Sequence, residues 1–442
     1  MKLHTLLLFI GLIPTMTACK DIDPGVESLT VKMKINYDEA FNGYSFPLEN
    51  IKLTITSVNT QQSTNVATTS TGEALFTGVI PGNYDIDAVV TIPATTYQEA
   101  TGIVTTENVV FNASIKNQLI NTSTISTIPQ LVLKAGRVGD WLIKQVYYAG
   151  SHRTDGALYR DQFIEIFNNS NEILYADQMY IGEALGNAST TFDATRNYFL
   201  PNGQWDWTKS IGMPTSITRA NEDYFYTKSL YRIGGNGTTY PVKPGESIVI
   251  AQSAQNHKSP FVSNDGTSIT VRNPALTIDL SNADFEVYLA PLLAKPLDSD
   301  IDNPKVPNLE VLTYFGTDYI LDNPGRNGFF IFKTTDKVEA YPQYPAPNTT
   351  TISSTTKYYY QIPNKYVIDA VETQPGVSEQ VPKKFAANFD AGFAFVPKGS
   401  YSSQSIIRKT SKVIGTRRVL QDTNNSSNDF DYFDLANPRG FK

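Results

Sequence analysis

The sequence has very few of the residues that build metal centres. Its 442 residues include three histidines and one cysteine. His4 precedes an apolar run at the N-terminus, and neither His152 nor His257 has a second His or Cys at metal-ligand spacing. We therefore expect His152 and His257 in surface loops. A Ser–His–Asp arrangement around His152 also lacks the Gly-x-Ser-x-Gly element that would support a serine nucleophile.

The chain also lacks long helical patterns and a basic bias. It has only five Met, and no long stretch of Ala, Leu, Glu and Lys repeats at helical spacing. The formal net charge of −7 argues against nucleic acid as a partner, because such binding needs a basic face. Instead, 25 Tyr and 23 Phe accompany many Thr, Val and Ile, and these residues favour strands. We expect an all-β protein with more than one domain.

The N-terminus has the pattern of a secretion signal. Met1-Lys2 precedes an apolar run over residues 6–10 that is too short to span a bilayer. Met16-Thr17-Ala18-Cys19 resembles a bacterial lipobox, in which the cysteine becomes the lipidated first residue of the mature protein. This resemblance predicts a signal peptide over residues 1–18 and an acyl anchor on Cys19. The alternative is an ordinary signal peptide with an incidental cysteine.

A short tether is expected over residues 19–28. Its first residues include Lys20, Asp21 and Asp23. A lysine followed by acids directly after the lipidated cysteine resembles the surface-export signal of certain Gram-negative lipoproteins. The resemblance implies a protein attached to the outer membrane through Cys19, facing the cell exterior.

A first β unit is expected over residues 29–133. Apolar and polar residues alternate over residues 29–35, which is the period of a half-buried strand. Thr71-Gly72 then precedes Ala74-Leu75-Phe76, and a V-x-P-G-x-Y element begins at Val79. This order resembles the transthyretin-like and Cna-B-like β-sandwiches. Such modules are spacers or stalks, and some bind carbohydrate.

After a linker at residues 134–140, a second β domain is expected over residues 141–442. Its ordered elements are an opening strand at 141–148, F-I-E-I-F-N at 163–168, P-G-E at 244–246, S-I-I-R at 405–408 and a D-T loop from 422. This series resembles the lamin-tail domain, an Ig-like β-sandwich. In that family the glutamate matching Glu165 is a framework residue, so we expect no catalytic role for it.

The second domain is much longer than a lamin-tail domain. The extra residues are expected as insertions near 186–237, 297–327 and 337–390, which are rich in Pro, Asn, Thr and Tyr. Their aromatic content argues against disorder, so we expect ordered elaborations that build a broad face on the sandwich. The whole arrangement resembles a family of surface lipoproteins that carry the domain of unknown function 4876.

Two segments suggest ligand sites. Asp298, Asp300 and Asp302 alternate along the chain, a spacing that converges oxygen ligands on Ca²⁺ in EF-type loops. A solvated acidic turn is the alternative. Trp205-Asp206-Trp207 places two flat rings beside a carboxylate, which suits a sugar ring or a protein hot spot. A small apolar cap over the sandwich is the alternative there.

Two functions remain open from the sequence. The first is a non-enzymatic binding or accessory module. The family resemblance implies as its partner a TonB-dependent outer-membrane transporter that takes up iron, haem, a glycan or a peptide. The second is an extracellular hydrolase or another enzyme acting on a polymer. Because no residue pair is identified as acid and base, the first is favoured and no catalytic residue is assigned.

Overall fold

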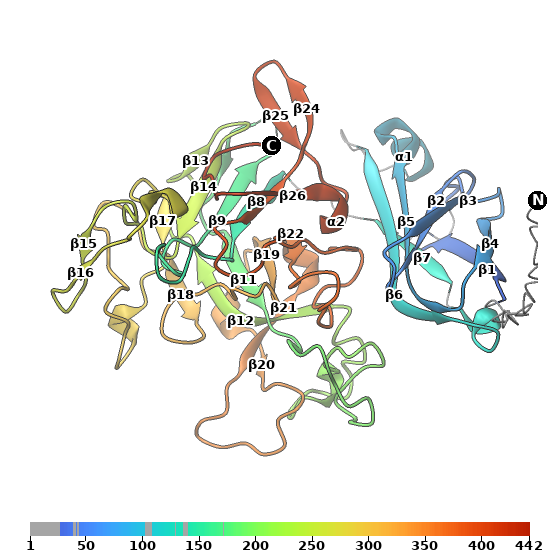
Figure 1. The fold of residues 1–442 in the computed structure, drawn as a ribbon. Helices are drawn as coiled ribbons and strands as arrows, with labels where there is room; N and C mark the ends of the chain where they lie inside the picture. Colours follow the sequence, from blue (N-terminus) through green and yellow to red (C-terminus); the bar gives the residue numbers. More distant parts are fainter. Residues whose placement is uncertain are drawn as a thin grey trace, which may run out of the picture.

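The chain forms two β units, each with its own hydrophobic core (Figure 1). The computed structural model describes residues 27–38, 41, 44–101, 108–128, 130–135, 140–170 and 172–442. The predicted all-β class is confirmed, since the described elements are mostly strands. Within the described ranges no helix has the length and apolar character needed to cross a membrane.

The first unit is a seven-stranded sheet folded around one core. Its elements are β1 (Leu29–Tyr37), β2 (Lys52–Ser57), β3 (Ser63–Ala67), β4 (Glu73–Val79), β5 (Gly82–Ile92), α1 (Ala94–Thr101), β6 (Val109–Ile120), η2 (Ile125–Thr127) and β7 (Leu131–Ala135). The strand order is β3-β2-β5-β6-β7-β1-β4. All pairs are antiparallel except β1 with β7, which run parallel.

Alternation of apolar and polar residues explains why this sheet has one dry face. In β1 the buried residues are Val31, Met33 and Ile35, and the residues between them are exposed. Because successive side chains of a strand point to opposite faces, the other face carries the polar residues.

The second unit contains a six-stranded sheet. Its strands are β8 (Trp141–Tyr147), β9 (Phe163–Asn168), β14 (Ser247–Ala251), β17 (Phe285–Glu286), β23 (Ser405–Arg408) and β26 (Phe430–Phe433). They lie in the order β17-β14-β9-β8-β23-β26. The first strand of the unit, β8, therefore pairs with β23, which comes close to the end of the chain.

A seven-stranded sheet forms the second layer of this unit. Its strands are β11 (Tyr180–Ala184), β12 (Tyr224–Arg232), β18 (Glu310–Thr313), β19 (Gly328–Phe332), β20 (Gln343–Tyr344), β21 (Tyr359–Pro363) and β22 (Val367–Glu372). The order is β20-β21-β12-β11-β19-β22, and β18 also pairs with β12.

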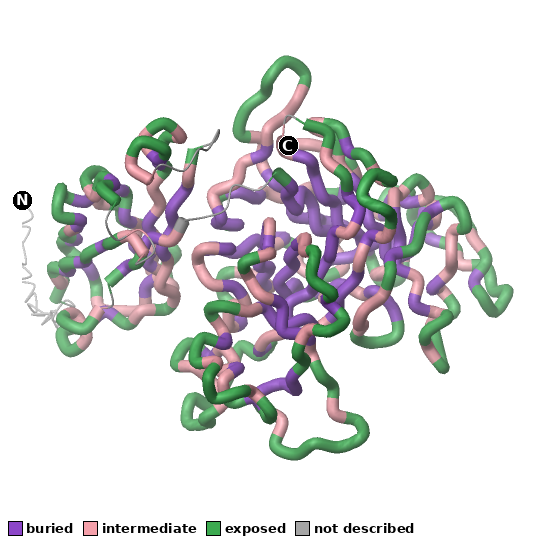
Figure 2. Tube along the Cα trace, turned by 180° about the vertical axis from the view of Figure 1, so that it is seen from behind, coloured by how far each residue is buried: buried purple, intermediate pink, exposed green. Residues whose placement is uncertain are grey.

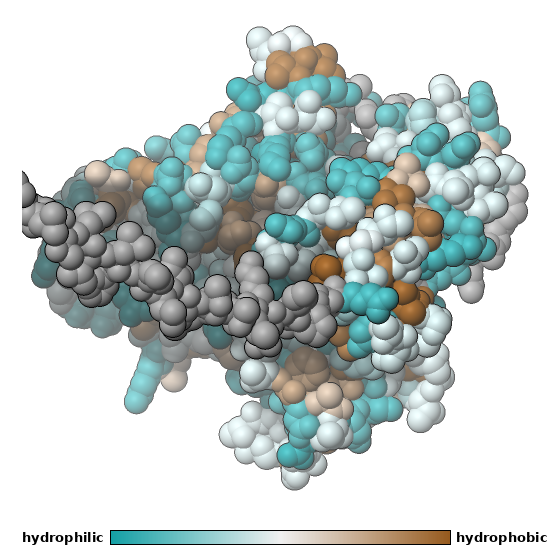
Figure 3. All heavy atoms as spheres, turned by 45° about the vertical axis from the view of Figure 1, so that its right-hand side comes forward, coloured by the Kyte–Doolittle hydropathy of each residue, from teal (hydrophilic) through white to brown (hydrophobic). Residues whose placement is uncertain are grey.

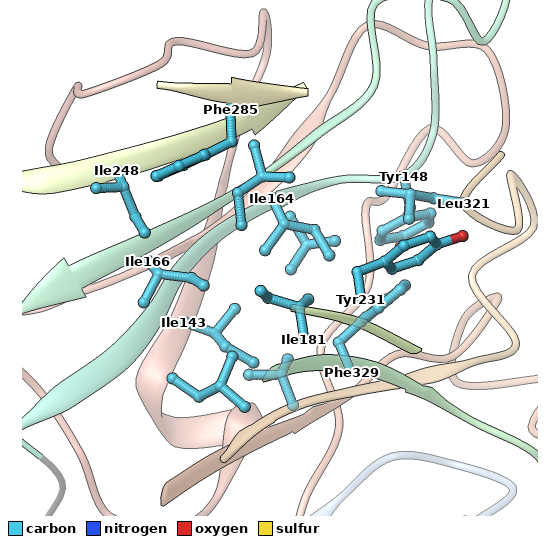
Figure 4. Packing of buried hydrophobic residues seen from close by; sticks show 14 of the residues in the cluster. Ile143, Tyr148, Ile164, Ile166, Ile181, Tyr231, Ile248, Phe285, Leu321 and Phe329 are labelled. Atoms are coloured by element: carbon cyan, nitrogen blue, oxygen red, sulfur yellow. The ribbon is translucent and has the colours of Figure 1, made fainter. Parts of the chain in front are cut away.

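The main core lies between these two sheets (Figure 4). Ile143, Ile164 and Ile248 come from the six-stranded sheet, and Ile181 and Phe329 come from the seven-stranded sheet. Their side chains point toward one another in the close-up, as expected for two stacked sheets. The second unit is thus a β-sandwich.

The outer faces of both sheets are also covered, so buried chain runs through the whole unit (Figure 2). Phe225, Phe330 and Phe385 belong to a cluster on the far side of the seven-stranded sheet. Tyr147 and Phe163 belong to another on the far side of the six-stranded sheet. Because both faces are covered, consecutive residues of strands such as β8 and β9 are buried, and burial does not alternate along them.

The prediction about the insertions is partly wrong. The sequence predicts the segments near 186–237, 297–327 and 337–390 as elaborations that build a face on the sandwich. Instead they supply β12, β18, β20, β21 and β22, five of the seven strands in one of its sheets. The reason is that a strand buried on both faces has no alternation to mark it, as β12 shows.

Short elements complete the second unit. They are β10 (Leu174–Tyr175), β13 (Pro241–Val242), β15 (Phe261–Val262), β16 (Ser268–Ile269), β24 (Thr410–Ile414), β25 (Arg417–Leu420), α2 (Ser426–Asp429), η3 (Trp207–Lys209), η4 (Pro274–Leu276), η5 (Ala290–Leu292), η6 (Val338–Ala340) and η7 (Asn364–Tyr366).

Candidate functional site

The predicted lipidation and export residues lie outside the described residues. This applies to Cys19, Lys20, Asp21 and Asp23. Their roles therefore remain predictions from the sequence.

The tryptophan platform is not formed as predicted. Trp207 is 4% exposed, and its ring stacks on Tyr226 with centroids 3.6 Å apart and an interplanar angle of 4°. Trp205 is partly exposed and packs edge-on against Trp207 at 6.1 Å. Asp206 caps η3 by accepting a hydrogen bond from the backbone N–H of Thr208. The buried ring of Trp207 leaves no flat exposed surface, so the structure agrees with the apolar-cap alternative.

The three aspartates of the calcium prediction do not converge. Asp298 is exposed, whereas Asp300 is buried and accepts a hydrogen bond from the backbone N–H of Leu289 at 3.0 Å. Asp302 accepts one from the side chain of Asn308 at 2.7 Å. Among the residues that the structure describes, no cluster of three or more His, Cys, Asp and Glu side chains has the arrangement of a metal site. The calcium prediction is therefore wrong for this geometry, because Asp300 and Asp302 bind different groups of the local fold.

The two histidines have different environments. His152 is exposed in a loop, as predicted, and its Nδ1 accepts a hydrogen bond from the backbone N–H of Asp155 at 3.1 Å. His257 was also expected at the surface, but it is fully buried. Burial lowers the pKa of His257 to about 4, so its imidazole is neutral at physiological pH.

Glu165 is a framework residue, as the lamin-tail resemblance implies. It is fully buried, and its Oε1 lies 2.8 Å from Nζ of Lys144. Its Oε2 accepts hydrogen bonds from Gln145 and from the backbone N–H of Arg439. Every oxygen is therefore satisfied by the sheet and by the C-terminal segment, which leaves no free base.

Two open hollows lie between the two units. Their volumes are ≈ 620 and ≈ 780 Å³, and both are lined by Asp85, Lys116, Val377 and Gln380. We call these two hollows together the interunit groove. One wall is the polar outer face of the N-terminal sheet, and it is formed by Lys52, Thr54, Thr56, Ser63, Asn65, Asp85, Asp87, Ser114 and Lys116.

One lysine of this wall pairs with both of its aspartates. Nζ of Lys116 lies 3.1 Å from Oδ1 of Asp87 and 3.5 Å from Oδ2 of Asp85. Burial alone lowers the pKa of Lys116, but the two carboxylates outweigh it and raise the pKa above its usual value. The lysine therefore stays protonated, and the wall presents fixed polar groups.

The opposite wall comes from the second unit and is partly aromatic. It includes Phe393, Phe395, Phe430 and Tyr432, together with the amide and hydroxyl groups of residues 425–428. Phe395 and Tyr432 are partly exposed, whereas Phe393 and Phe430 are buried beneath them. The groove thus has one hydrogen-bonding wall and one wall with ring faces.

Two buried aspartates hold the loop that carries these groups. Asp429 accepts hydrogen bonds from the backbone N–H and the hydroxyl of Thr423, at 2.8 and 2.7 Å. Asp390 accepts a hydrogen bond from the backbone N–H of Ser426 at 2.8 Å. Loops are normally mobile, and these side chains fix this one against the sandwich.

Arg408 links this loop to both sheets. Its guanidinium is 2% exposed and lies 2.7 Å from Asp369 on β22, 3.3 Å from Asp422 and 3.5 Å from Asp429. Burial raises the pKa of Asp369 and Asp429, and the guanidinium opposes that increase. This is the arginine of the S-I-I-R element, so the sequence motif marks a positioning residue for the groove loop.

The units touch at one end of this loop. The side-chain amide of Asn112 on β6 donates a hydrogen bond to the carbonyl of Thr423. Asn112 is fully buried although it belongs to the polar face of its sheet, because the second unit covers it. Its Oδ1 and the Nδ2 of Asn424 are both buried without a hydrogen-bond partner. The contact between the units is therefore incompletely satisfied.

A smaller cavity of ≈ 350 Å³ lies within the second unit. Arg153 lies over the ring of Tyr401 at 4.4 Å, and Lys228 lies over Phe315 at 5.0 Å; all four residues line it. Asp318 also lines it, and burial together with the nearby charge of Asp300 raises the pKa of Asp318 to about 8. This carboxyl is therefore mostly protonated at neutral pH.

Sequence reasoning missed the groove residues. A signal existed, because charged or hydroxyl side chains occupy alternate positions on three neighbouring strands, as in Asp85 and Asp87 on β5. The aromatic wall could not be predicted from the sequence, because no local pattern indicates which loop of the second unit faces this sheet.

Comparisons with known proteins agree with this fold. A family model described as "Protein of unknown function (DUF4876)" matches residues 243–435. The chain is similar to the crystal structure of a DUF4876 family protein from Bacteroides thetaiotaomicron, with 24% identity, 91% of this chain and 94% of that chain covered, and a TM-score of 0.52. A DUF3823 family protein from Bacteroides ovatus matches at 12% identity, covering 51% of this chain and 99% of that chain, with a TM-score of 0.15.

No curated protein matches the chain. The predicted resemblance to the DUF4876 family is nevertheless confirmed: the family model matches residues 243–435, and the similar crystal structure shares the all-β fold.

Proposed function

We propose that this protein is a non-enzymatic surface lipoprotein that binds a glycan in the interunit groove. Cys19 would carry the acyl anchor to the outer membrane, and the two β units would present the groove to the cell exterior. The lipobox at residues 16–19 and the following Lys and Asp residues support this location.

The groove is the observation that carries the proposal. A pyranose ring has an apolar face that packs on aromatic rings and hydroxyls that need polar partners around its edge. Phe395 and Tyr432 offer ring surface on one wall. Thr54, Asp87 and Lys116 offer donors and acceptors on the other. Because the groove is open and combines both kinds of wall, it suits a chain of sugars.

The carboxylates of the groove favour binding over hydrolysis. Asp85 and Asp87 share one lysine as counter-ion. Asp87 also accepts a hydrogen bond from Ser114 at 2.7 Å, and Asp85 accepts one from the backbone N–H of Asn117 at 2.9 Å. Carboxylates that are paired and hydrogen-bonded in this way serve as fixed acceptors for sugar hydroxyls.

The proposed partner is a TonB-dependent outer-membrane transporter. The support is the family-level resemblance to surface lipoproteins and the exterior location that the N-terminal sequence predicts. In this arrangement the groove would hold the glycan next to the transporter.

Affinity electrophoresis in gels that contain soluble polysaccharides tests the proposed ligand. The protein would be the whole chain with Cys19→Ser, which removes the acyl anchor. At least one polysaccharide should retard it, and Phe395→Ala should weaken binding by about tenfold or more, the scale of an aromatic hot spot. Phe315→Ala is the matched control, because Phe315 is 51% exposed but lies outside the groove.

Two results would contradict the proposal. One is that no polysaccharide retards the protein, and the other is that Phe395→Ala and Phe315→Ala behave alike. Release of new reducing ends from the retarding polysaccharide would instead support the extracellular-hydrolase alternative. The anchor is tested separately, because Cys19→Ser should move the protein from the membrane fraction to the soluble fraction.

A further inference from the structure

The hairpin β24–β25 projects from the body of the second unit. It forms a separate two-stranded sheet that pairs with neither sheet of the sandwich. It stands out at the top of the molecule in two opposite views (Figures 1 and 2). Residues 411–416, which make up its outer half, are all exposed.

The tip of this hairpin is apolar. Val413 is 58% exposed and Ile414 is 51% exposed, and Gly415 turns the chain with a φ of 61°. Successive side chains of a strand point to opposite faces, so the apolar surface covers both faces of the tip. A hydrophobic patch is visible at this projecting end (Figure 3). If the hairpin folded back onto the body, only one of these two faces would be buried, and the other would remain exposed.

Basic residues surround the apolar tip. The segment from Lys409 to Leu420 has four Lys or Arg and no Asp or Glu, in a chain whose net charge is −7. In the hairpin register Val413 lies opposite Arg418, and Ile414 lies opposite Arg417. Lys412 is exposed beside the tip. Apolar side chains are therefore flanked directly by cations.

Two residues of β25 hold the hairpin against the body of the second unit. Nη1 of Arg417 donates to the carbonyls of Asn169 and Ser170, at 2.9 and 2.7 Å. Leu420 is 2% exposed and belongs to a small cluster with Leu142 and Phe167. Because β25 is fixed in this way while Val413 and Ile414 stay exposed, the hairpin presents its apolar end in one orientation.

We propose that the tip of β24–β25 inserts into the headgroup region of an anionic lipid surface. Val413 and Ile414 would enter the apolar boundary, while the exposed Lys412 would remain among the anionic headgroups. Arg417 and Arg418, which contact other residues of the second unit, would add to the positive charge behind the tip. A lipid surface matches both properties of the tip, because apolar burial and attraction to anionic lipid add in interfacial binding. A hot spot on a protein partner would instead be expected to carry aromatic anchors, which this tip lacks.

This inference does not depend on glycan binding by the groove. The hairpin would give the protein a second contact with the membrane in addition to the anchor predicted at Cys19. Two weak membrane signals together hold a protein much more firmly than either alone. The hairpin contact would also restrict how the groove is oriented above the membrane.

Vesicle co-sedimentation of the whole Cys19→Ser chain tests the hairpin without the acyl anchor. The protein should bind vesicles that contain phosphatidylglycerol more strongly than vesicles of phosphatidylcholine alone, and high salt should weaken the binding. Val413→Asp with Ile414→Asp should reduce binding by about tenfold or more, because two buried apolar side chains are lost. Lys412→Glu should reduce binding to the anionic vesicles.

The matched control is Val262→Asp. Val262 is 62% exposed on β15, which belongs to another two-stranded hairpin, β15–β16. This variant should bind vesicles like the parent, and melting curves should show that all variants are folded. The proposal fails if no vesicle binds the parent, or if the tip variant and the control bind equally. It also fails if the tip variant only converts a dimer to a monomer in gel filtration, since the tip would then be a contact between copies.

Discussion

The burial of Trp207 makes a strong prediction about Trp207→Ala. The indole is 4% exposed and stacks on Tyr226 within a cluster that includes Ala220 and Tyr344. A buried aromatic ring removes roughly 150–250 Å² from water, and truncation of a buried Trp costs about 3–5 kcal/mol. Removal of the indole would leave a cavity beside Tyr226 that neighbouring residues cannot fill, so most of this loss of stability would remain. We therefore expect the free energy of unfolding to fall by about 4 kcal/mol.

Trp205→Ala is the matched control. Its ring is only partly buried and makes an edge contact at 6.1 Å, so truncation should cost about 1–2 kcal/mol. Urea unfolding at neutral pH, followed by near-ultraviolet circular dichroism and fluorescence, measures both values. All three tryptophans of the chain lie in the second unit, so these signals report on that unit. If Trp207→Ala keeps parental stability, the ring is not part of the core and the packing described here is wrong.

Three further predictions concern buried charges of the second unit. Arg408→Met should lower the free energy of unfolding by about 3–5 kcal/mol at pH 7, because it leaves buried carboxylates without a cation. This loss, measured by urea unfolding, should be smaller in mild acid, because protonation removes the charge of these carboxylates. The pKa of Asp318 is raised to about 8 in the folded state, so the unfolded state releases this proton at lower pH and the parent loses stability as pH rises from about 4 to 8. Asp318→Asn should therefore gain stability relative to the parent over this pH range. Equal profiles of stability against pH for the two proteins would contradict this. Asp177 accepts backbone N–H bonds from Thr239 and Tyr240, and these lower its pKa to about 2 despite burial. Asp177→Asn should lose about 2–3 kcal/mol at neutral pH, and its difference from the parent should vanish as pH falls from about 4 toward 2.

The sequence predicted the first unit better than the second. A strand that is buried on only one face can be recognised by its alternating apolar and polar residues, and β1 coincides with the alternating residues near 29–35. In the second unit both faces of each sheet are covered, so strands such as β12 and β22 have no such period. The sequence alone places these strands in insertions, because only the tertiary structure reveals which segments pair.

The candidate site was less predictable than the fold. A Trp-Asp-Trp sequence suggests exposure, but nothing local indicates that Tyr226 covers Trp207. The alternating aspartates likewise gave no hint that Asp300 would cap the backbone N–H of Leu289. The groove depends on two segments more than 300 positions apart, Asn112 and Thr423, whose contact no local pattern contains. The order of the motifs did point to one residue that joins distant elements, which is Arg408 of the S-I-I-R element.

The pairing of β8 with β23 determines when the second unit can become complete during synthesis and export. The side chains of Ser405 and Gln145 are hydrogen-bonded although they are 260 positions apart in the sequence. The centre of the six-stranded sheet therefore remains open until almost the last strand of the chain has arrived, and closure of so large a loop is slow. During that interval the apolar edge of β8 is exposed to other chains. We expect the polypeptide to need protection from aggregation until its C-terminal residues follow, and a stop codon shortly before β23 to yield an insoluble product rather than a shorter domain.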